Sequence, residues 1–159
     1  MISAVDLLKG IGVYLGLEVI RVPGATGYLD TNYRGKVEAA IASLQERDWV
    51  FLHVEAPDEV SHEGNWEKKL QALEDFDAQV VGPAVKAMEQ FGSYRVLLVT
   101  DHLTPVEMKT HAIGAVPLAA CGTGLEPDGA AGYDESLLKK GSRHFETGPD
   151  LMDFFLRSG

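Results

Sequence analysis

An acidic residue and a histidine stand four positions apart in the stretch 54–62, directly after an apolar run. The run 49–54, Trp-Val-Phe-Leu-His-Val, has the length and the aromatic and β-branched content of a strand, and Pro57 blocks further ladder pairing. If the residues from Asp58 to His62 form one turn of helix, both side chains lie on one face and could hold the same ion. The stretch therefore predicts half of a metal site.

A second apolar run ends in the same kind of residues. Residues 94–100, Tyr-Arg-Val-Leu-Leu-Val-Thr, are followed at once by Asp101 and His102, and His111 comes shortly after. Ligands of open α/β sheets gather at the carboxyl ends of the strands, and a mixture of imidazole and carboxylate is typical of zinc, manganese or iron. Each motif alone also occurs by chance, but their shared position beyond strand ends favours metal binding.

These motifs form an ordered set with three stretches nearer the amino terminus, Ser3–Gly10, Val22–Asn32 and His53–Asp58. The later members are Thr100-Asp-His-Leu-Thr-Pro105 and, after His111, Val116-Pro-Leu118. Over nearly the whole chain, the set closely resembles the carboxyl-terminal half of the archaeal-type, cofactor-independent phosphoglycerate mutases of the alkaline phosphatase superfamily.

The resemblance implies a pair of divalent metal ions, Mn²⁺ or Zn²⁺ with Mg²⁺ as the alternative, and no organic cofactor. Asp58, His62 and His111 would hold one ion, and Asp101 and His102 the other. The implied chemistry, part of glycolysis, interconverts 3-phosphoglycerate and 2-phosphoglycerate. A metal-activated hydroxyl takes the phosphoryl group and returns it to the neighbouring position.

Other parts of the resembling enzymes carry groups that this chain does not match. An amino-terminal half brings a Ser or Thr nucleophile and another Asp, and an inserted domain brings basic residues that grip the phosphate. We therefore expect this chain to be the carboxyl-terminal part of a metal-dependent phosphotransferase, with no catalytic residue of its own and no mutase activity in isolation.

Bulk composition sets further limits. With 159 residues and 45% hydrophobic content, the chain can build one sizeable core, so we predict a single domain over 1–159. The single cysteine, Cys121, and the lack of any run of roughly 18 apolar residues favour a cytoplasmic protein. A net charge of −10 argues against nucleic acid and anionic membranes as partners, and it leaves bound cations to attract an anionic phosphoglycerate substrate.

The pattern along the chain predicts an α/β fold with a mostly parallel sheet flanked by helices, and the resemblance implies an alkaline-phosphatase-like fold. Strands are expected near 17–22, 49–54, 94–99 and 116–121. Helices are expected from a Ser3 cap to Gly16, from Thr31 or Asn32 to Arg47, from Asn65 with a bend at Gly82-Pro83, from Asp134 to Lys140, and from Pro149.

Two other functions stay open. One is another metal-dependent phosphotransferase or phosphohydrolase of the same superfamily, and the other is a non-catalytic metal-binding or interaction module. An exposed sheet edge also predicts self-association. Two polar residues are expected to be structural: His53 as a hydrogen-bonded core histidine, and Ser61 pointing away from the ion.

Overall fold

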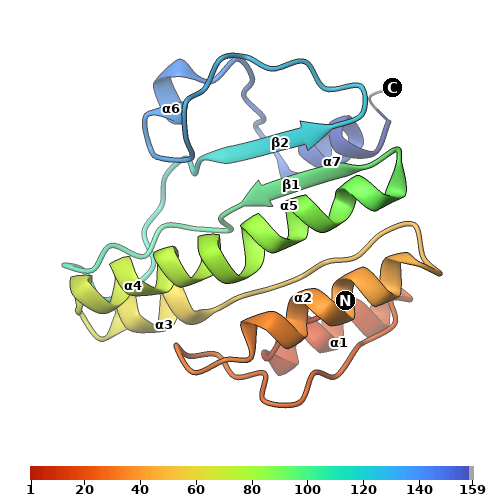
Figure 1. The fold of residues 1–159 in the computed structure, drawn as a ribbon. Coiled ribbons are helices and arrows are strands. Elements are labelled where there is room, and N and C mark those ends of the chain that lie inside the picture. The colour runs from red at the N-terminus through yellow and green to blue at the C-terminus, as the bar shows by residue number, and fades with distance from the viewer. Residues whose placement is uncertain (158–159) are drawn as a thin grey trace. The chain divides into compact units, whose positions relative to one another are not determined.

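The computed structural model describes residues 1–157 of an α/β protein and divides the chain into two compact units. Unit 1 consists of Met1–Met88 and Thr104–Thr110. Unit 2 consists of Glu89–Leu103 and the residues from His111 onward. The order of the elements can be followed in Figure 1. The expectation of a single domain stays a prediction.

Helices make up most of unit 1. They are α1 (Asp6–Tyr14), α2 (Tyr33–Leu44), α3 (Ala56–His62), α4 (Trp66–Phe76), the π-helical turn η1 (Asp77–Val81) and α5 (Gly82–Met88). The predicted caps Asn32 and Asn65 are confirmed, since their side chains accept hydrogen bonds from the backbone N–H of Gly35 and Lys68 at 2.8 and 2.9 Å. The predicted break at Gly82-Pro83 coincides with the change from η1 to α5.

The predicted cap of the first helix is wrong. Val5 stands at the N-cap of α1, and the Ser3 hydroxyl instead accepts a hydrogen bond from the Val5 N–H at 3.0 Å. Helix α1 begins at Asp6, so Ser3 lies two residues before its N-cap.

Neither expected strand of unit 1 is a regular strand. Within 17–22, the Ile20 N–H donates to the Met1 carbonyl at 2.9 Å. Within 49–54, hydrogen bonds join Ile2 to Phe51 and His53 around the bridge at Leu52. In the described part of unit 1, these contacts of both runs are made with Met1 and Ile2.

Unit 2 contains the sheet. The predicted strands are confirmed as β1 (Arg95–Val99) and β2 (Leu118–Gly122), but they pair antiparallel, with Leu97 opposite Ala120. A parallel pair needs a crossover connection, usually a helix, and the described residues between β1 and β2 form none. A mostly parallel sheet is therefore not shown.

The remaining helices of unit 2 are η2 (Glu89–Phe91), α6 (Leu137–Lys140) and α7 (Gly148–Arg157). The predicted last helix is confirmed, and its Phe155 is buried. Ser136 is the N-cap of α6, so the cap expected at Asp134 is wrong by two residues. Within residues 1–157, no helix is both long and apolar enough to cross a membrane.

The core of unit 1 fixes α3. Ala56 and Val60, four residues apart on α3, are both fully buried and pack with Tyr33, Val37 and other core residues. Burying a side chain such as Val60 stabilises the fold by roughly 1.5–3 kcal/mol. Because this face is held in the core, the residues on the other side of the helix keep a fixed direction.

A lysine is also buried in unit 1. The Lys36 side chain is fully buried, and its Nζ donates a hydrogen bond to the His53 carbonyl at 3.3 Å. Burial lowers the pKa of the Lys36 ammonium below its usual 10.5, and the Glu55 carboxylate offsets part of this effect. The unfolded chain therefore binds a proton here more strongly than the folded chain.

Because of Lys36, the free energy of unfolding should vary with pH in the alkaline range. Between the lowered folded-state pKa and 10.5, the free energy of unfolding should rise with pH, because the unfolded state holds more protons in that window. Urea unfolding across this range should show a smaller rise in Lys36→Met. The control Lys86→Met removes an exposed lysine from α5. An equal change of slope in both variants would contradict the prediction.

Candidate metal centre

Helix α3 begins and ends at positions that suit its polar residues. Pro57 lies in its first turn, where the missing N–H costs no helical hydrogen bond. Asp58 is in the first turn and His62 in the last, so both complement the helix dipole. Because Ala56 and Val60 face the core, Asp58 and His62 share the opposite side. The predicted helical turn is confirmed.

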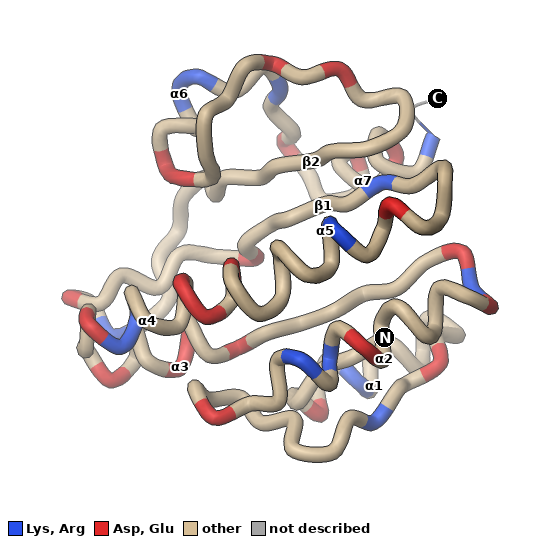
Figure 2. The backbone as a smooth tube through the Cα atoms, in the orientation of Figure 1, with Lys and Arg blue, Asp and Glu red and all other residues tan. Residues whose placement is uncertain are grey.

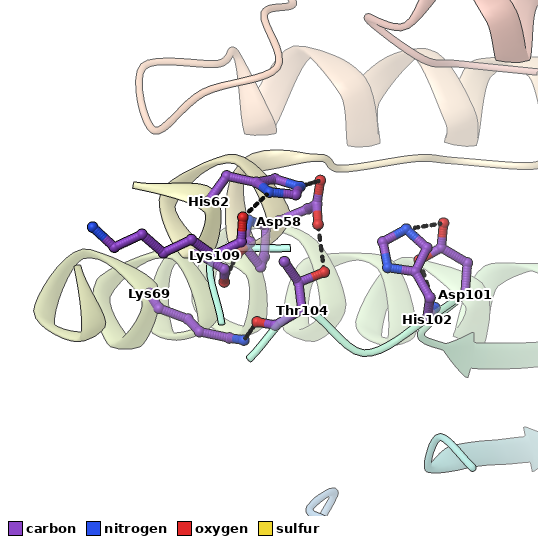
Figure 3. Close-up of polar contacts among 9 residues, drawn as sticks. Asp58, His62, Lys69, Asp101, His102, Thr104 and Lys109 are labelled. Carbon is purple, nitrogen blue, oxygen red and sulfur yellow. Dashed lines mark hydrogen bonds and ion pairs between the residues drawn. The ribbon is translucent and has the colours of Figure 1, made fainter. Parts of the chain in front are cut away.

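The two side chains face each other, as Figure 3 shows. His62 Nε2 lies 3.2 Å from Asp58 Oδ2, and the side chains are 33% and 26% exposed. The other ring nitrogen, Nδ1, lies 3.0 Å from the Lys109 carbonyl oxygen. A carbonyl can only accept, so Nδ1 carries a proton, and Nε2 is the nitrogen that gains or loses the second proton beside Asp58 Oδ2. Both expected ligand atoms of α3 thus point toward one place.

The other carboxylate oxygen is already occupied. The Thr104 hydroxyl donates to Asp58 Oδ1 at 2.5 Å, and the Lys69 ammonium donates to the Thr104 carbonyl at 2.8 Å. Thr104 is 7% exposed, so its hydroxyl makes this bond largely shielded from water. The arrangement leaves Asp58 Oδ2, the oxygen nearest His62, to bind a cation.

The contacts with the Lys109 carbonyl and Asp58 also change the pKa of His62. Its pKa is raised above 6.5, first by the hydrogen bond to the Lys109 carbonyl and then by the negative charges of Asp58 and Glu59, while burial acts in the opposite direction. An imidazole that attracts a proton at Nε2 in this way is also placed to attract a divalent cation.

The remaining expected ligands lie together in unit 2. The His102 N–H donates to Asp101 Oδ1 at 3.0 Å, and His102 Nε2 lies 3.4 Å from Asp101 Oδ2. The His102 and His111 rings have centroids 3.8 Å apart, with a ring nitrogen of one within 4.8 Å of one on the other. An antiparallel bridge between Leu103 and Ala112 holds the two segments in contact.

This donor set fits a divalent metal. Each unit presents carboxylate oxygen and imidazole nitrogen, and the hydrogen bond from His62 Nδ1 to the Lys109 carbonyl leaves Nε2 facing Asp58 Oδ2. The division of the five residues between two ions, taken from the resemblance, stays a prediction.

The structural role expected for Ser61 is supported, whereas His53 is hydrogen bonded as expected but is half-buried and lies outside the core cluster. His53 Nδ1 lies 3.2 Å from the Ser3 hydroxyl. Ser61 is fully buried and donates to the Pro57 carbonyl, away from the face that carries Asp58 and His62.

Sequence reasoning missed the groups that hold the ligands. Thr104 lies within one of the quoted motifs and yet received no role, and Lys69 and Lys109 lie in none of them. Their contacts join positions 35 to 47 residues apart. Only the order Asp-His-x-Thr-Pro after a strand could have pointed to Thr104.

The chain belongs to the Metalloenzyme superfamily, whose family description matches residues 1–148. Its similarity is higher still to particular enzymes. It is 55% identical over 157 residues to a protein from Geobacter sulfurreducens named as a probable 2,3-bisphosphoglycerate-independent phosphoglycerate mutase. It is 51% identical over 159 residues to the phosphoglycerate mutase of that name from Methanosarcina acetivorans.

The matches cover nearly all of this chain but a minor part of its relatives. They include 98% and 99% of this chain, and 39% and 40% of the Geobacter and Methanosarcina proteins. A solved structure of a protein from Pyrococcus horikoshii matches with a TM-score of 0.81 and 30% identity, over 88% of this chain and 42% of that one. The resemblance seen in the sequence is therefore confirmed, for a portion of the longer enzymes.

His62 should titrate above 6.5 when no metal has been added, because the Lys109 carbonyl and Asp58 favour the protonated ring. The stability that it contributes is present below 6.5 and is lost as pH rises through the folded-state pKa. Asp58→Asn should lower this pKa, measured from the imidazole C–H resonances by NMR. Glu38→Gln removes an exposed carboxylate on α2 as the control. A pKa that Asp58→Asn leaves unchanged would contradict the assignment.

Proposed function

We propose that this chain is the metal-binding part of a cofactor-independent phosphoglycerate mutase that interconverts 3-phosphoglycerate and 2-phosphoglycerate in glycolysis. The relatives named above carry this activity in their names, and the chain spans about 40% of their length. The observation that carries the proposal is the 3.2 Å approach of Asp58 Oδ2 and His62 Nε2, each with its other polar atom already hydrogen bonded.

The proposed ligands follow the grouping given by the resemblance. Asp58, His62 and His111 hold one divalent ion, and Asp101 and His102 help to hold a second, each ion being Mn²⁺ or Zn²⁺, or else Mg²⁺. The donors within each unit support this, because carboxylate and imidazole together suit these metals. An alkaline-phosphatase-like fold with a larger, mostly parallel sheet, formed as a single domain, belongs to the same proposal.

The ions would supply charge stabilisation for the transferring phosphoryl group and a lowered pKa for a hydroxyl nucleophile. The chain's own part is to bind and orient: the fixed Nε2 of His62 and Oδ2 of Asp58 need no rearrangement to meet a cation. We assign no nucleophile here, and we place it in the portion of the relatives that this chain does not match. Ser61 does not suit that role, because its hydroxyl is buried on the core side of α3.

The net negative charge of the chain is a further reason to expect that bound cations are needed to attract the substrate. The chain carries 24 acidic residues against 14 lysines and arginines, and Figure 2 shows both kinds scattered along the helices and loops. Such a chain attracts an anionic phosphoglycerate only where bound cations reverse the local sign. A cytoplasmic location and the absence of nucleic acid and membrane partners are part of this proposal. Self-association through an exposed sheet edge stays a prediction.

Metal binding should depend on the proposed ligands. Calorimetric titration with Mn²⁺ or Zn²⁺ should show affinity weakened about tenfold or more in His62→Ala and in His111→Ala, since each loses a direct donor worth at least ~1.4 kcal/mol. The matched control is His144→Ala, which removes an exposed histidine paired with Glu146. Equal losses in all three variants would indicate nonspecific surface binding instead.

Catalysis should require the part that the chain does not match. In a coupled mutase assay, the metal-loaded chain alone should be silent. A chimera that carries this chain in place of the matching segment of the Geobacter sulfurreducens relative should turn over, given 55% identity. His62→Ala in the chimera should lower kcat/KM on the order of 10³-fold or more, because several kcal/mol of charge stabilisation is lost.

The outcomes separate the candidate functions. An inactive but folded and metal-loaded chimera would favour a different phosphotransferase or a non-catalytic module. Turnover by the chain alone that His111→Ala abolishes would show that it contains a nucleophile after all.

A further inference from the structure

One short segment of the chain touches both proposed ligands of α3. The 104–110 segment packs with unit 1, although the residues through Leu103 and those from His111 onward belong to unit 2. At its first residue, the Thr104 hydroxyl reaches Asp58, and near its end the Lys109 carbonyl reaches His62. Two neighbouring side chains of one helix are thus held by two points of a single loop.

Thr104 determines which oxygen of Asp58 is available. A carboxylate can rotate and exchange its oxygens, but rotation here would break the 2.5 Å bond from the Thr104 hydroxyl to Oδ1. Thr104 is itself held, because its side chain is nearly buried and its carbonyl accepts from the Lys69 ammonium at 2.8 Å. Oδ2 therefore stays on the side of His62 Nε2.

Lys109 directs its carbonyl by an unusual backbone conformation. Its φ of 53° is in the left-handed region, the only such value among the non-glycine residues that the structure describes. Residues other than glycine adopt this region at a cost, and such strain gathers at functional sites. The N–H groups of Met108 and Lys109 both donate to the Pro105 carbonyl at 3.0 Å, which closes the turn.

The side chain of Lys109 also helps to hold its carbonyl near His62. Its Cε would lie 2.2 Å from a Cβ added at Gly64, so the lysine stem lies against the backbone just beyond α3. Gly64 also has a φ of +77°, which favours glycine there. The turn and the end of α3 thus depend on each other for their shape.

We infer that Thr104 and Lys109 are positioning residues, which fix Asp58 and His62 in the orientation that a divalent ion needs before the ion arrives. The inference rests on the proposed metal site. It also gives the 104–110 segment a second role, because only Leu103 separates Thr104 from Asp101-His102, and only Thr110 separates Lys109 from His111. One loop thereby holds two proposed ligands and covalently connects the other three.

The test uses the metal affinity of the whole chain, measured by calorimetry with Zn²⁺ and again with Mn²⁺. Thr104→Val keeps the shape of the side chain but removes the hydroxyl, and we expect affinity to fall about 10- to 100-fold. Thr104→Ser restores the hydroxyl and should stay within about threefold of the parent chain. Thr104→Ala serves in place of the valine variant if circular dichroism shows that the latter is unfolded.

A double-mutant cycle separates positioning from a general structural effect. In an Asp58→Ala background, Thr104→Val should cause no further loss of affinity, since the hydroxyl then has no ligand to hold. An equal loss in both backgrounds would overturn the inference, and so would parental affinity in Thr104→Val.

A matched pair tests the backbone at Lys109. Both Lys109→Gly and Lys109→Pro remove the ammonium, but glycine accepts a φ of 53° and keeps the N–H that bonds to Pro105, whereas proline can do neither. We expect the glycine variant to stay within about threefold of the parent and the proline variant to lose about tenfold or more. Equal affinities in the pair would overturn the role of the Lys109 carbonyl.

The same measurements distinguish a failure of the proposed metal site from a failure of the positioning role alone. If Asp58→Ala and His62→Ala both bind metal as the parent does, the site itself is wrong, and the positioning role falls with it. If those two variants lose affinity while Thr104→Val and Lys109→Pro do not, only the positioning role is wrong.

Discussion

The proton on Nδ1 of His62 is the constraint on which the proposed site depends. A histidine in solution exchanges its proton between two nitrogens, and a metal takes whichever is free. The Lys109 carbonyl at 3.0 Å accepts from Nδ1 and so removes that choice. Nε2 is then the donor atom, and it already lies 3.2 Å from Asp58 Oδ2. The buried face of α3 holds the ring in place, and the turn closed on the Pro105 carbonyl holds the Lys109 carbonyl.

The two faces of α3 have different roles. Ala56 and Val60 anchor the helix in the core, while Asp58 and His62 are left partly exposed. This arrangement has unfavourable local features. Lys109 has a left-handed backbone conformation, and the Asp58 carboxylate is partly shielded from water next to the His62 ring. Proteins tolerate such features where the surrounding packing is firm, and they use them where a ligand will relieve them. A metal ion would relieve the second of these.

Local pattern was enough to find the ligands but not what holds them. Pro57 suits the first turn of a helix, and a helical turn is what puts Asp58 and His62 on one face, so the sequence pointed to α3. The apolar runs 94–99 and 116–121 were predictable as strands, but their antiparallel pairing depends on the route of the chain between them. The runs 17–22 and 49–54 look equally apolar and yet form no regular strand in the described chain, where they bond to Met1 and Ile2.

The positioning groups depend on contacts that no local pattern encodes. Thr104 meets Asp58 across 46 residues, and Lys109 meets His62 across 47. A lysine at positive φ also runs against the preference of its residue type, so no propensity would have predicted that turn. Such departures from local preference are expected where a site imposes its own geometry.

The most direct measurement is the anomalous X-ray scattering of crystals of this chain soaked in Zn²⁺, recorded on both sides of the zinc absorption edge. The account predicts an anomalous peak about 2.0–2.2 Å from both Asp58 Oδ2 and His62 Nε2, with the Thr104 and Lys109 hydrogen bonds intact. Zinc found only on exposed carboxylates, or bound to His62 through Nδ1 with the Lys109 carbonyl turned away, would contradict it.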